Sequence, residues 1–185
     1  MLGYLLARQG LDVVVLEKHK DFLRDFRGDT VHPSTLEVLG ELGLLDAFLA
    51  RPHQELRQVK VQIADETFQV GDFGHLKVRC PYIAFMPQWD FLDFIADEGR
   101  GLPNFRLLMS TEGRELQMTG ERVTGVLAEH SGETIAIAAQ LVVAADGRSS
   151  TLRQQAGLEV TTLGAPIDVL WFRVGRTGDS VEQTL

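Results

Sequence analysis

Two short runs of consecutive apolar residues, each ended by an acidic residue, constrain the fold of this sequence most strongly. Residues 13–16 read VVVL and are followed by Glu17, and residues 141–145 read LVVAA and are followed by Asp146. Each run is too short for a helix and lacks the alternation of a half-exposed strand. Each therefore predicts a strand buried on both faces, which is typical of a parallel sheet.

Periodicity around these runs predicts an α/β chain. Helical spacing covers residues 2–9, and an amphipathic stretch over residues 34–50 begins at a capping-box pair, Ser34 and Glu37. A helix followed by the strand at 13–16 is the second half of a βαβ unit, whose partner strand we expect before Met1. The remaining pattern predicts helices over 88–99 and 150–156, a hairpin over 59–70, and strands over 105–109, 114–118, 122–129, 134–138 and 167–174.

Composition excludes several classes of function. The formal net charge of -8 argues against a nucleic-acid partner, because such proteins need a basic face. No apolar run approaches the roughly 20 residues that span a bilayer, and the N-terminus lacks the basic region of a signal peptide. The single cysteine, Cys80, and the dispersed histidines predict neither a disulfide framework nor a metal site. We expect a soluble, cytoplasmic protein without a membrane partner.

Glu17 is the candidate binding residue with the clearest chemistry. An acidic side chain at the end of the second strand of a dinucleotide-binding fold accepts hydrogen bonds from ribose hydroxyls, and a carboxylate can hold two of them. The phosphate loop of such a fold precedes this acid by about 20 residues, which places it before Met1. None of the 18 glycines forms G-x-G-x-x-G. The alternative is that Glu17 is only the first polar residue after a buried strand.

Two further segments combine charged residues and glycine near predicted element ends. Arg27 precedes Gly28 and a helix start, where a cation and main-chain N–H groups could neutralise a phosphate. Asp146-Gly147 ends the second apolar run, where ligands lie in open α/β sheets. Ordinary loop capping and a plain Asp-Gly turn are the alternatives, and from the residues alone both stay open.

Four segments occur in one order along nearly the whole chain. They are DVVVLEKH, FRGDTVHPSTLEVLGELGLLD, MPQWDFLDFIAD and LVVAADGRSSTLRQQAGL. This order resembles the FAD-dependent aromatic-ring hydroxylases, the class A flavoprotein monooxygenases of the p-hydroxybenzoate hydroxylase type. The resemblance implies that Glu17 holds the FAD adenosine ribose, that Arg27 lies close to the flavin and its phosphates, and that Gln88 touches the ribityl–phosphate region. It also implies FAD and NAD(P)H binding by a D-G-x-x-S-x-x-R motif, formed by Asp146, Gly147, Ser150 and Arg153.

The resemblance implies a Rossmann-like FAD-binding domain over residues 1–58 and 76–159, with antiparallel β insertions. Residues 59–75 and 160–185 would be fragments of a substrate-binding sheet. The family's first strand, its glycine loop and a later G-D motif are absent from the sequence. We therefore expect a relative shortened at both ends.

The function implied by the resemblance is hydroxylation of a small aromatic substrate by an FAD-dependent, NAD(P)H-using monooxygenase. No catalytic residue can be assigned, and without the glycine loop we expect FAD binding to be weak or absent. One alternative is a non-catalytic remnant that binds no flavin, with self-association into a homo-oligomer left open. The other is a related flavoprotein such as a dehydrogenase or a halogenase, although the halogenase motif W-x-W-x-I-P is lacking.

Overall fold

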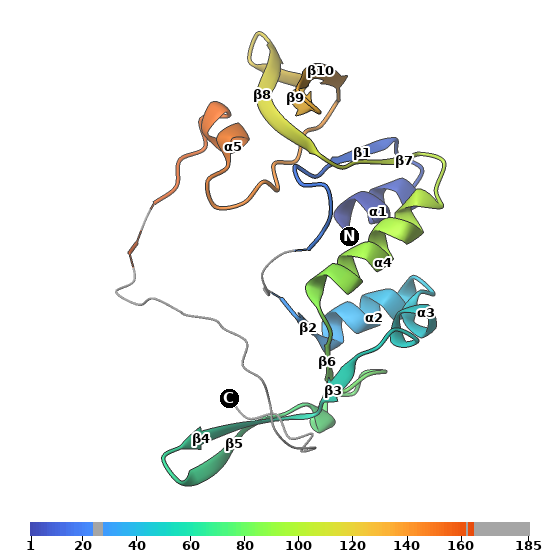
Figure 1. Cartoon of the computed structure of the whole chain (residues 1–185), viewed down its shortest axis with the longest axis vertical. Coiled ribbons are helices and arrows are strands. Elements are labelled where there is room, and N and C mark those ends of the chain that lie inside the picture. Colours follow the sequence, from blue (N-terminus) through green and yellow to red (C-terminus); the bar gives the residue numbers. More distant parts are fainter. Residues whose placement is uncertain (24–27, 162, 165–185) are drawn as a thin grey trace. The chain divides into compact units, whose positions relative to one another are not determined.

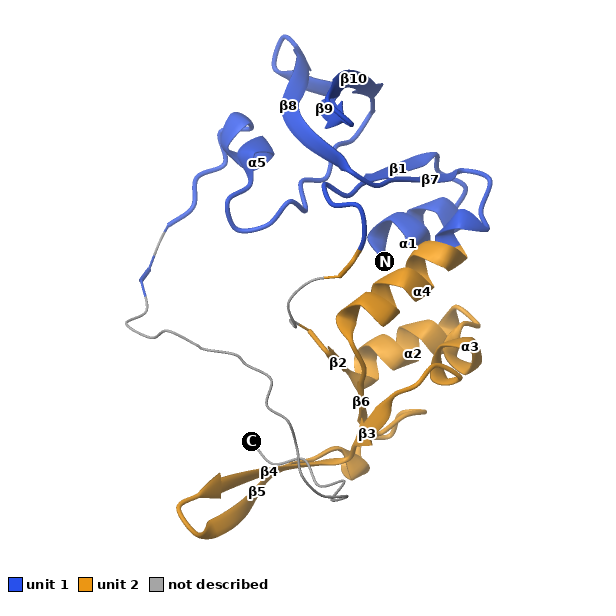
Figure 2. Ribbon diagram, viewed as in Figure 1, with its two compact units in different colours: residues 1–21, 99–173 blue, residues 22–98, 174–185 orange. Residues whose placement is uncertain are grey.

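The structure is a computed structural model that describes residues 1–23, 28–161 and 163–164 (Figure 1). Its helices are α1 (Leu2–Arg8), α2 (Pro33–Glu41), α3 (Leu45–Leu49), α4 (Gln88–Arg100) and α5 (Thr151–Gln155), with a 3-10 turn, η1 (Phe73–His75). Its strands are β1 (Val13–Leu16), β2 (Thr30–Val31), β3 (Gln54–Leu56), β4 (Gln58–Ile63), β5 (Glu66–Asp72), β6 (Ile83–Phe85), β7 (Phe105–Leu108), β8 (Thr111–Thr119), β9 (Arg122–His130) and β10 (Glu133–Ala138). The described residues fall into two compact units, unit 1 within residues 1–21 and 99–164 and unit 2 within residues 22–98 (Figure 2).

Unit 1 contains a parallel pair of strands, β1 and β7. Their register runs from Val13↔Phe105 to Leu16↔Leu108. The strand predicted at residues 13–16 is confirmed, but its predicted full burial is wrong, since all four residues are half-buried. The parallel partner that the structure supplies is β7, where we expected a segment before Met1. Half-burial follows because β1 has one hydrogen-bonded neighbour among the described residues.

The helix α1 approaches the parallel pair closely through a glycine. A Cβ added to Gly3 would lie 2.7 Å from Val15 Cγ2, so a larger residue would push the helix away from the strand. The connection from α1 to β1 is held by Asn104, whose side-chain amide donates to the carbonyl oxygens of Ala7 (2.7 Å) and Leu11 (2.6 Å). One carboxamide therefore bonds to two carbonyl oxygens on either side of the turn that follows α1.

The strands predicted over residues 114–118, 122–129 and 134–138 are confirmed, and they form an antiparallel meander. β9 pairs with β8 on one side and with β10 on the other. The turn between β9 and β10 is Ser131-Gly132, with φ of 52° and 86°. Both values lie in the left-handed region, which a tight two-residue hairpin turn requires because it matches the twist of the strands.

Thr111 is completely buried where the parallel pair joins the meander. Its N–H donates to the Glu17 carbonyl oxygen (2.9 Å), which continues the ladder beyond β1. Its hydroxyl donates to the Met109 carbonyl oxygen (2.9 Å) and lies 2.6 Å from His130 Nδ1. Because a hydroxyl has one hydrogen, the bond to Met109 requires that His130 Nδ1 be the donor toward Thr111.

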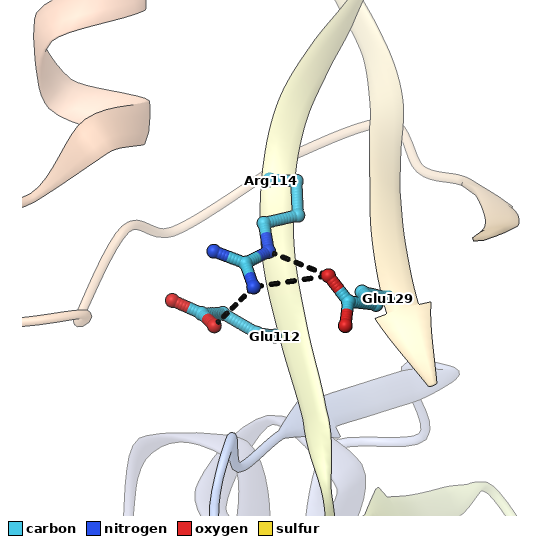
Figure 3. A network of polar contacts seen from close by, with 3 residues as sticks. All are labelled: Glu112, Arg114 and Glu129. Carbon is cyan, nitrogen blue, oxygen red and sulfur yellow. Dashed lines mark hydrogen bonds and ion pairs between the residues drawn. The ribbon is translucent and has the colours of Figure 1, made fainter. Parts of the chain in front are cut away.

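Three charged side chains form a network on the surface of β8 and β9 (Figure 3). Glu112 and Glu129 lie opposite each other in the ladder, and like charges in that position destabilise a sheet. Arg114 donates to Glu129 Oε2 from Nη2 (2.9 Å) and Nε (3.2 Å), and its Nη2 lies 3.0 Å from Glu112 Oε2. Such exposed pairs contribute about 0–1 kcal/mol. The main effect of Arg114 is therefore to offset the repulsion between the two carboxylates.

The short helix α5 is docked on β8 through the side chain of Gln155. Its Oε1 accepts the N–H of Leu116 (2.8 Å), and its Nε2 donates to the carbonyl oxygen of Arg114 (2.9 Å). One carboxamide thus makes a donor and an acceptor contact to the main chain of the strand. This pair of bonds fixes the helix, and the turn before it, relative to the meander.

Unit 2 contains a small antiparallel sheet, a separate hairpin and a helical core. β6 pairs with β2 and β3, and β4 pairs with β5, which confirms the hairpin predicted over residues 59–70. Leu36, Leu39 and Phe48 are fully buried. The Phe48 ring packs edge-on against Phe91 of α4, with ring centroids 5.8 Å apart. These contacts join α2, α3 and α4 around one apolar cluster.

The single helix predicted over residues 34–50 is wrong, because the chain forms α2 and α3 instead. Gly43 separates them with φ of 74°, a left-handed conformation that ends a helix. The predicted capping box is not formed either. The helix starts at Pro33 without a side-chain cap, and the Glu37 carboxylate instead accepts the N–H of Arg79 (2.6 Å).

The second buried strand, predicted over residues 141–145, is also wrong. These residues form no regular secondary structure, and Leu141 and Val143 are 75% and 54% exposed. An apolar run becomes a buried strand only where a neighbouring strand supplies donors and acceptors. Among the described residues no strand pairs with this run. The strand predicted over 167–174 lies outside the described residues.

None of the described helices is long and apolar enough to cross a membrane.

Replacing Gly125 by alanine is expected to destabilise unit 1. An added Cβ would collide with the main-chain oxygen of Ile137 and lie 2.8 Å from Gln117 Oε1, and a main-chain atom in a paired strand cannot easily move. Overpacking of this kind costs about 1–3 kcal/mol. Urea denaturation measures the loss in unfolding free energy of G125A, with G71A as the control. Gly71 also lies in a strand, but a Cβ there would meet only Val59, at 3.6 Å. Equal stability of the two variants would contradict the packing of β9 against β10.

Candidate functional site

Glu17 follows the last residue of a parallel strand, as predicted. Its N–H donates to the Leu108 carbonyl oxygen (2.9 Å), one step beyond the paired residues of β1. Its Oε1 accepts the N–H of His19 (2.9 Å), which orients the carboxylate over its own turn. Glu17 is half-buried. A carboxylate therefore lies at the carboxyl end of a parallel strand, the edge where ligands bind in open α/β sheets.

The D-G-x-x-S-x-x-R motif forms one compact turn before α5. Gly147 has φ of 94°, a conformation that residues with a Cβ rarely adopt. Ser150 is buried and caps α5, its Oγ accepting the N–H of Arg153 (3.0 Å). The Ser150 hydroxyl and the main-chain N–H groups of Thr151 and Leu152 lie close enough to the Asp146 carboxylate to act on its pKa. The structure therefore brings these four residues together.

The Asp146 carboxylate is occupied by the helix that follows it. Burial acts to raise the pKa of Asp146, but the hydrogen bonds from Ser150 and from the main chain outweigh it, so the pKa lies below its usual value. The carboxylate is thus ionised at neutral pH and lies at the positive end of α5.

Arg153 carries an unsatisfied donor. Among the described side chains, its Nε is a buried polar atom without a hydrogen-bond partner, a rare condition in folded proteins. Its Nη2 donates to the Arg148 carbonyl oxygen (3.0 Å), which folds the guanidinium back over the turn. Arg153 lines an open depression of about 500 Å³ together with Gln154, Gly157, Leu158, Glu159 and Val160. A ligand oxygen reaching Nε would satisfy this donor.

An apolar contact at Gly113 of β8 brings the end of β1 and α5 together within unit 1. A Cβ on Gly113 would lie 3.3 Å from Leu152 and 3.9 Å from Leu16. Leu16 directly precedes Glu17 and Leu152 directly precedes Arg153, so two predicted binding segments pack on the same point of β8. Sequence reasoning missed this residue because glycine has no functional group. Its only signal is its place beside a predicted strand.

Gln88 is the first residue of α4, in unit 2. Its N–H donates to Asp29 Oδ1 (3.1 Å), and the N–H of Met86 donates to the Asp29 carbonyl oxygen (3.0 Å). Gly28 has φ of 75°, and a Cβ there would lie 2.8 Å from Gln88 Nε2. The structure thus brings Gln88 against the two residues that follow Arg27. Arg27 itself lies outside the described residues.

Sequence reasoning did not single out Asp29. Its bond to Gln88 spans 59 positions, so no local pattern contains both partners. The available signal is an acidic residue between a glycine and a short apolar stretch, which is common in loops.

A second polar cluster in unit 2 contains the chain's single cysteine. Cys80 and Tyr82 are 5% and 6% exposed, and the Cys80 thiol and the Glu55 carboxylate both act on the pKa of the Tyr82 hydroxyl. Burial and these two groups raise the pKa of Tyr82 far above its usual value, so the hydroxyl remains a neutral donor. A buried thiol beside a neutral phenol lacks the exposure of a reactive cysteine. The described residues also contain no group of three His, Cys, Asp or Glu side chains that could hold a metal ion.

Known proteins resemble this chain in sequence and in fold. A family profile described as FAD binding domain matches residues 1–182. The chain is 28% identical over 174 residues to a 6-methylpretetramide 4-monooxygenase of Streptomyces rimosus, covering 94% of this chain and 42% of that protein. It is 28% identical over 159 residues to the uncharacterized aromatic compound monooxygenase YhjG of Bacillus subtilis (strain 168), covering 86% and 31%.

A solved structure with the same fold is PqsL, a probable FAD-dependent monooxygenase of Pseudomonas aeruginosa. The TM-score is 0.72 at 23% identity, with 89% of this chain and 44% of that chain covered. This likeness shows the fold, a mixed α/β arrangement shared with flavin monooxygenases. The chain spans less than half the length of these relatives.

Replacing Asp146 by asparagine is expected to remove an acid-sensitive part of the stability of unit 1. Because the pKa of Asp146 is lower in the folded chain than in the unfolded chain, its contribution is fully present above the unfolded value, about pH 4, and is lost as the pH falls through the lower folded value. Urea denaturation of the wild type and D146N from pH 7 to about pH 2.5 measures this. The difference in unfolding free energy should shrink toward the acid end. A difference independent of pH would contradict the role of the carboxylate at α5.

Proposed function

Because this chain belongs to the FAD binding domain family, we propose that it is the FAD-binding part of an NAD(P)H-using monooxygenase that hydroxylates a small aromatic compound. The observation that supports this most directly is Glu17 at the carboxyl end of a parallel strand, beside the docked D-G-x-x-S-x-x-R turn in unit 1. Both curated relatives are named as monooxygenases, and one name specifies an aromatic compound.

The chemistry of the described residues fits parts of FAD. In unit 1, the Glu17 carboxylate offers acceptors for the hydroxyls of the adenosine ribose. The orphaned Nε of Arg153 offers a buried, charge-assisted donor to a phosphate or carboxylate oxygen. In unit 2, the Gln88 carboxamide would contact the ribityl–phosphate region. Arg27, outside the described residues, would lie close to the flavin phosphates.

The other motif residues would act by holding the turn. Ser150 caps α5 by accepting the N–H of Arg153, the Ser150 hydroxyl acts to lower the pKa of Asp146, and Gly147 permits the left-handed bend. Their part in FAD or NAD(P)H binding is thus to keep Arg153 in place.

Bound FAD would supply the redox and oxygen chemistry, with NAD(P)H as the reductant. The residues of this chain bind and orient the cofactor. The FAD-binding domain would comprise residues 1–58 and 76–159, with residues 59–75 and 160–185 contributing to a substrate-binding sheet. A cytoplasmic location belongs to the same proposal. The exposed run at residues 141–145 is a reason to expect self-association of the isolated chain.

The sequence supports only weak FAD binding by the chain as given. In related folds the pyrophosphate rests on main-chain N–H groups of a G-x-G-x-x-G loop, and this sequence contains none. Hydrogen bonds to charged groups contribute about 1.5–3 kcal/mol each, and about 1.4 kcal/mol corresponds to tenfold in affinity. The loss of two or three such bonds would weaken binding by several powers of ten.

Replacing Glu17 by glutamine is expected to weaken FAD binding by about tenfold or more, because one charge-assisted acceptor is lost. Titration with FAD, followed by flavin fluorescence and by ligand-observed NMR for weak binding, measures the effect. E121Q is the matched control, since Glu121 is an exposed carboxylate of the turn between β8 and β9. Riboflavin, which lacks the adenosine, should bind E17Q and the wild type alike.

Absence of FAD binding by the wild type at millimolar concentration would contradict the proposed function. Submicromolar binding, or NAD(P)H oxidation stimulated by a phenol, would show instead that the chain does not need the glycine loop.

A further inference from the structure

The start of α4 is held by a residue to which no role has been assigned. Asp29 accepts two hydrogen bonds from the segment Met86-Pro87-Gln88, one to its main-chain oxygen (3.0 Å) and one to its carboxylate (3.1 Å). The donors are the N–H groups on either side of Pro87, which has none itself. Asp29 therefore bonds to the first residue after β6 and to the first residue of α4, on either side of the two-residue connection Met86-Pro87.

Asp29 connects the end of the β2–β6 pair with the start of α4. β2 and β6 pair through Thr30↔Phe85 and Val31↔Ala84, and the bond from Met86 to the Asp29 carbonyl oxygen is the next along this pair. The side chain of Asp29 then satisfies a first-turn N–H of α4, which has no partner within the helix. Main chain and side chain of one residue thus set where the sheet ends and where the helix begins.

The Gln88 side chain lies close to Gly28, the residue before Asp29. A Cβ on Gly28 would lie 2.8 Å from Gln88 Nε2, and φ of 75° at Gly28 turns the chain over the carboxamide. Gln88 is thus bonded at its main chain to Asp29, and the main chain at Gly28 comes so close to its carboxamide that a Cβ would not fit. Arg27 immediately precedes Gly28 in the sequence, so the two residues next to Gln88 directly follow a predicted binding residue.

We propose that Asp29 is a positioning residue for flavin binding, acting through Gln88 and the loop that follows Arg27. This inference rests on the proposed function. Asp29 also places a negative charge at the positive end of α4, a helix of 13 residues. That charge disfavours a phosphate at this helix end. The Gln88 carboxamide, a neutral group, is then the part of α4 suited to the hydroxyl groups of the ribityl chain.

Three variants of the full chain test the proposal. D29A removes the acceptor, D29N retains an acceptor oxygen without the charge, and E37A is the matched control. Glu37 is a carboxylate of the same unit that also accepts a distant main-chain N–H, but its donor is Arg79 and not a residue of the Gln88 segment. The measurements are FAD affinity, thermal stability and NMR hydrogen exchange at the Gln88 amide.

D29A is expected to lose about tenfold in FAD affinity and to exchange the Gln88 amide about tenfold faster. D29N should recover most of both losses, and E37A should bind FAD like the wild type even where its thermal stability falls as far as that of D29A. Unchanged FAD affinity or unchanged Gln88 exchange in D29A, or the same affinity loss in E37A, would overturn the positioning role while leaving the proposed function in place. A wild-type chain that does not bind FAD would overturn both proposals.

Discussion

The parallel ladder between β1 and β7 is the interaction on which the rest of unit 1 depends. It continues at both ends, through the bond from the Val13 N–H to the Asn104 carbonyl oxygen and the bond from the Thr111 N–H to the Glu17 carbonyl oxygen. One set of main-chain bonds therefore runs from Val13 and Asn104 to the first residue of β8. Because the Thr111 hydroxyl also meets His130, the far end of β9 is fixed to the same point. Glu17 owes its position to this junction rather than to its own side chain.

Elements whose stability is local could be predicted from the sequence. The β8–β10 meander follows from alternating apolar residues and a Ser-Gly turn, and α4 from the spacing of Phe91, Leu92 and Ile95. The break between α2 and α3 could not be predicted in this way. The helical spacing of leucines continues across Gly43, although the main chain leaves the helical conformation there. The run at 141–145 has a strand composition, but burial of a strand depends on a partner. β2, β3 and β6 are too short for a pattern and exist through their mutual pairing.

In the candidate site, too, residues with a local signal could be predicted and residues that act over a long stretch of sequence could not. Glu17 and the D-G-x-x-S-x-x-R motif could be recognised because a strand end and a capped turn are local signals. The residues that hold them could not, since each acts across a long stretch of sequence. Gln155 reaches main-chain groups 39 and 41 positions away, and Asp29 reaches an N–H 59 positions away. Gly113 contributes only the space in which Leu16 and Leu152 meet.

The bonds of Gln155 also protect an open strand edge. β8 is the outer strand of its sheet, and an outer strand with free main-chain groups can recruit a strand from another molecule. Gln155 takes one N–H and one carbonyl oxygen of that edge, so another chain cannot use them. The five residues of α5 thus serve two purposes at once, since they complete the turn that carries Arg153 and close an aggregation-prone edge. Unfolding of α5 would therefore free these two groups of β8 and promote association between chains, even when no cofactor is present.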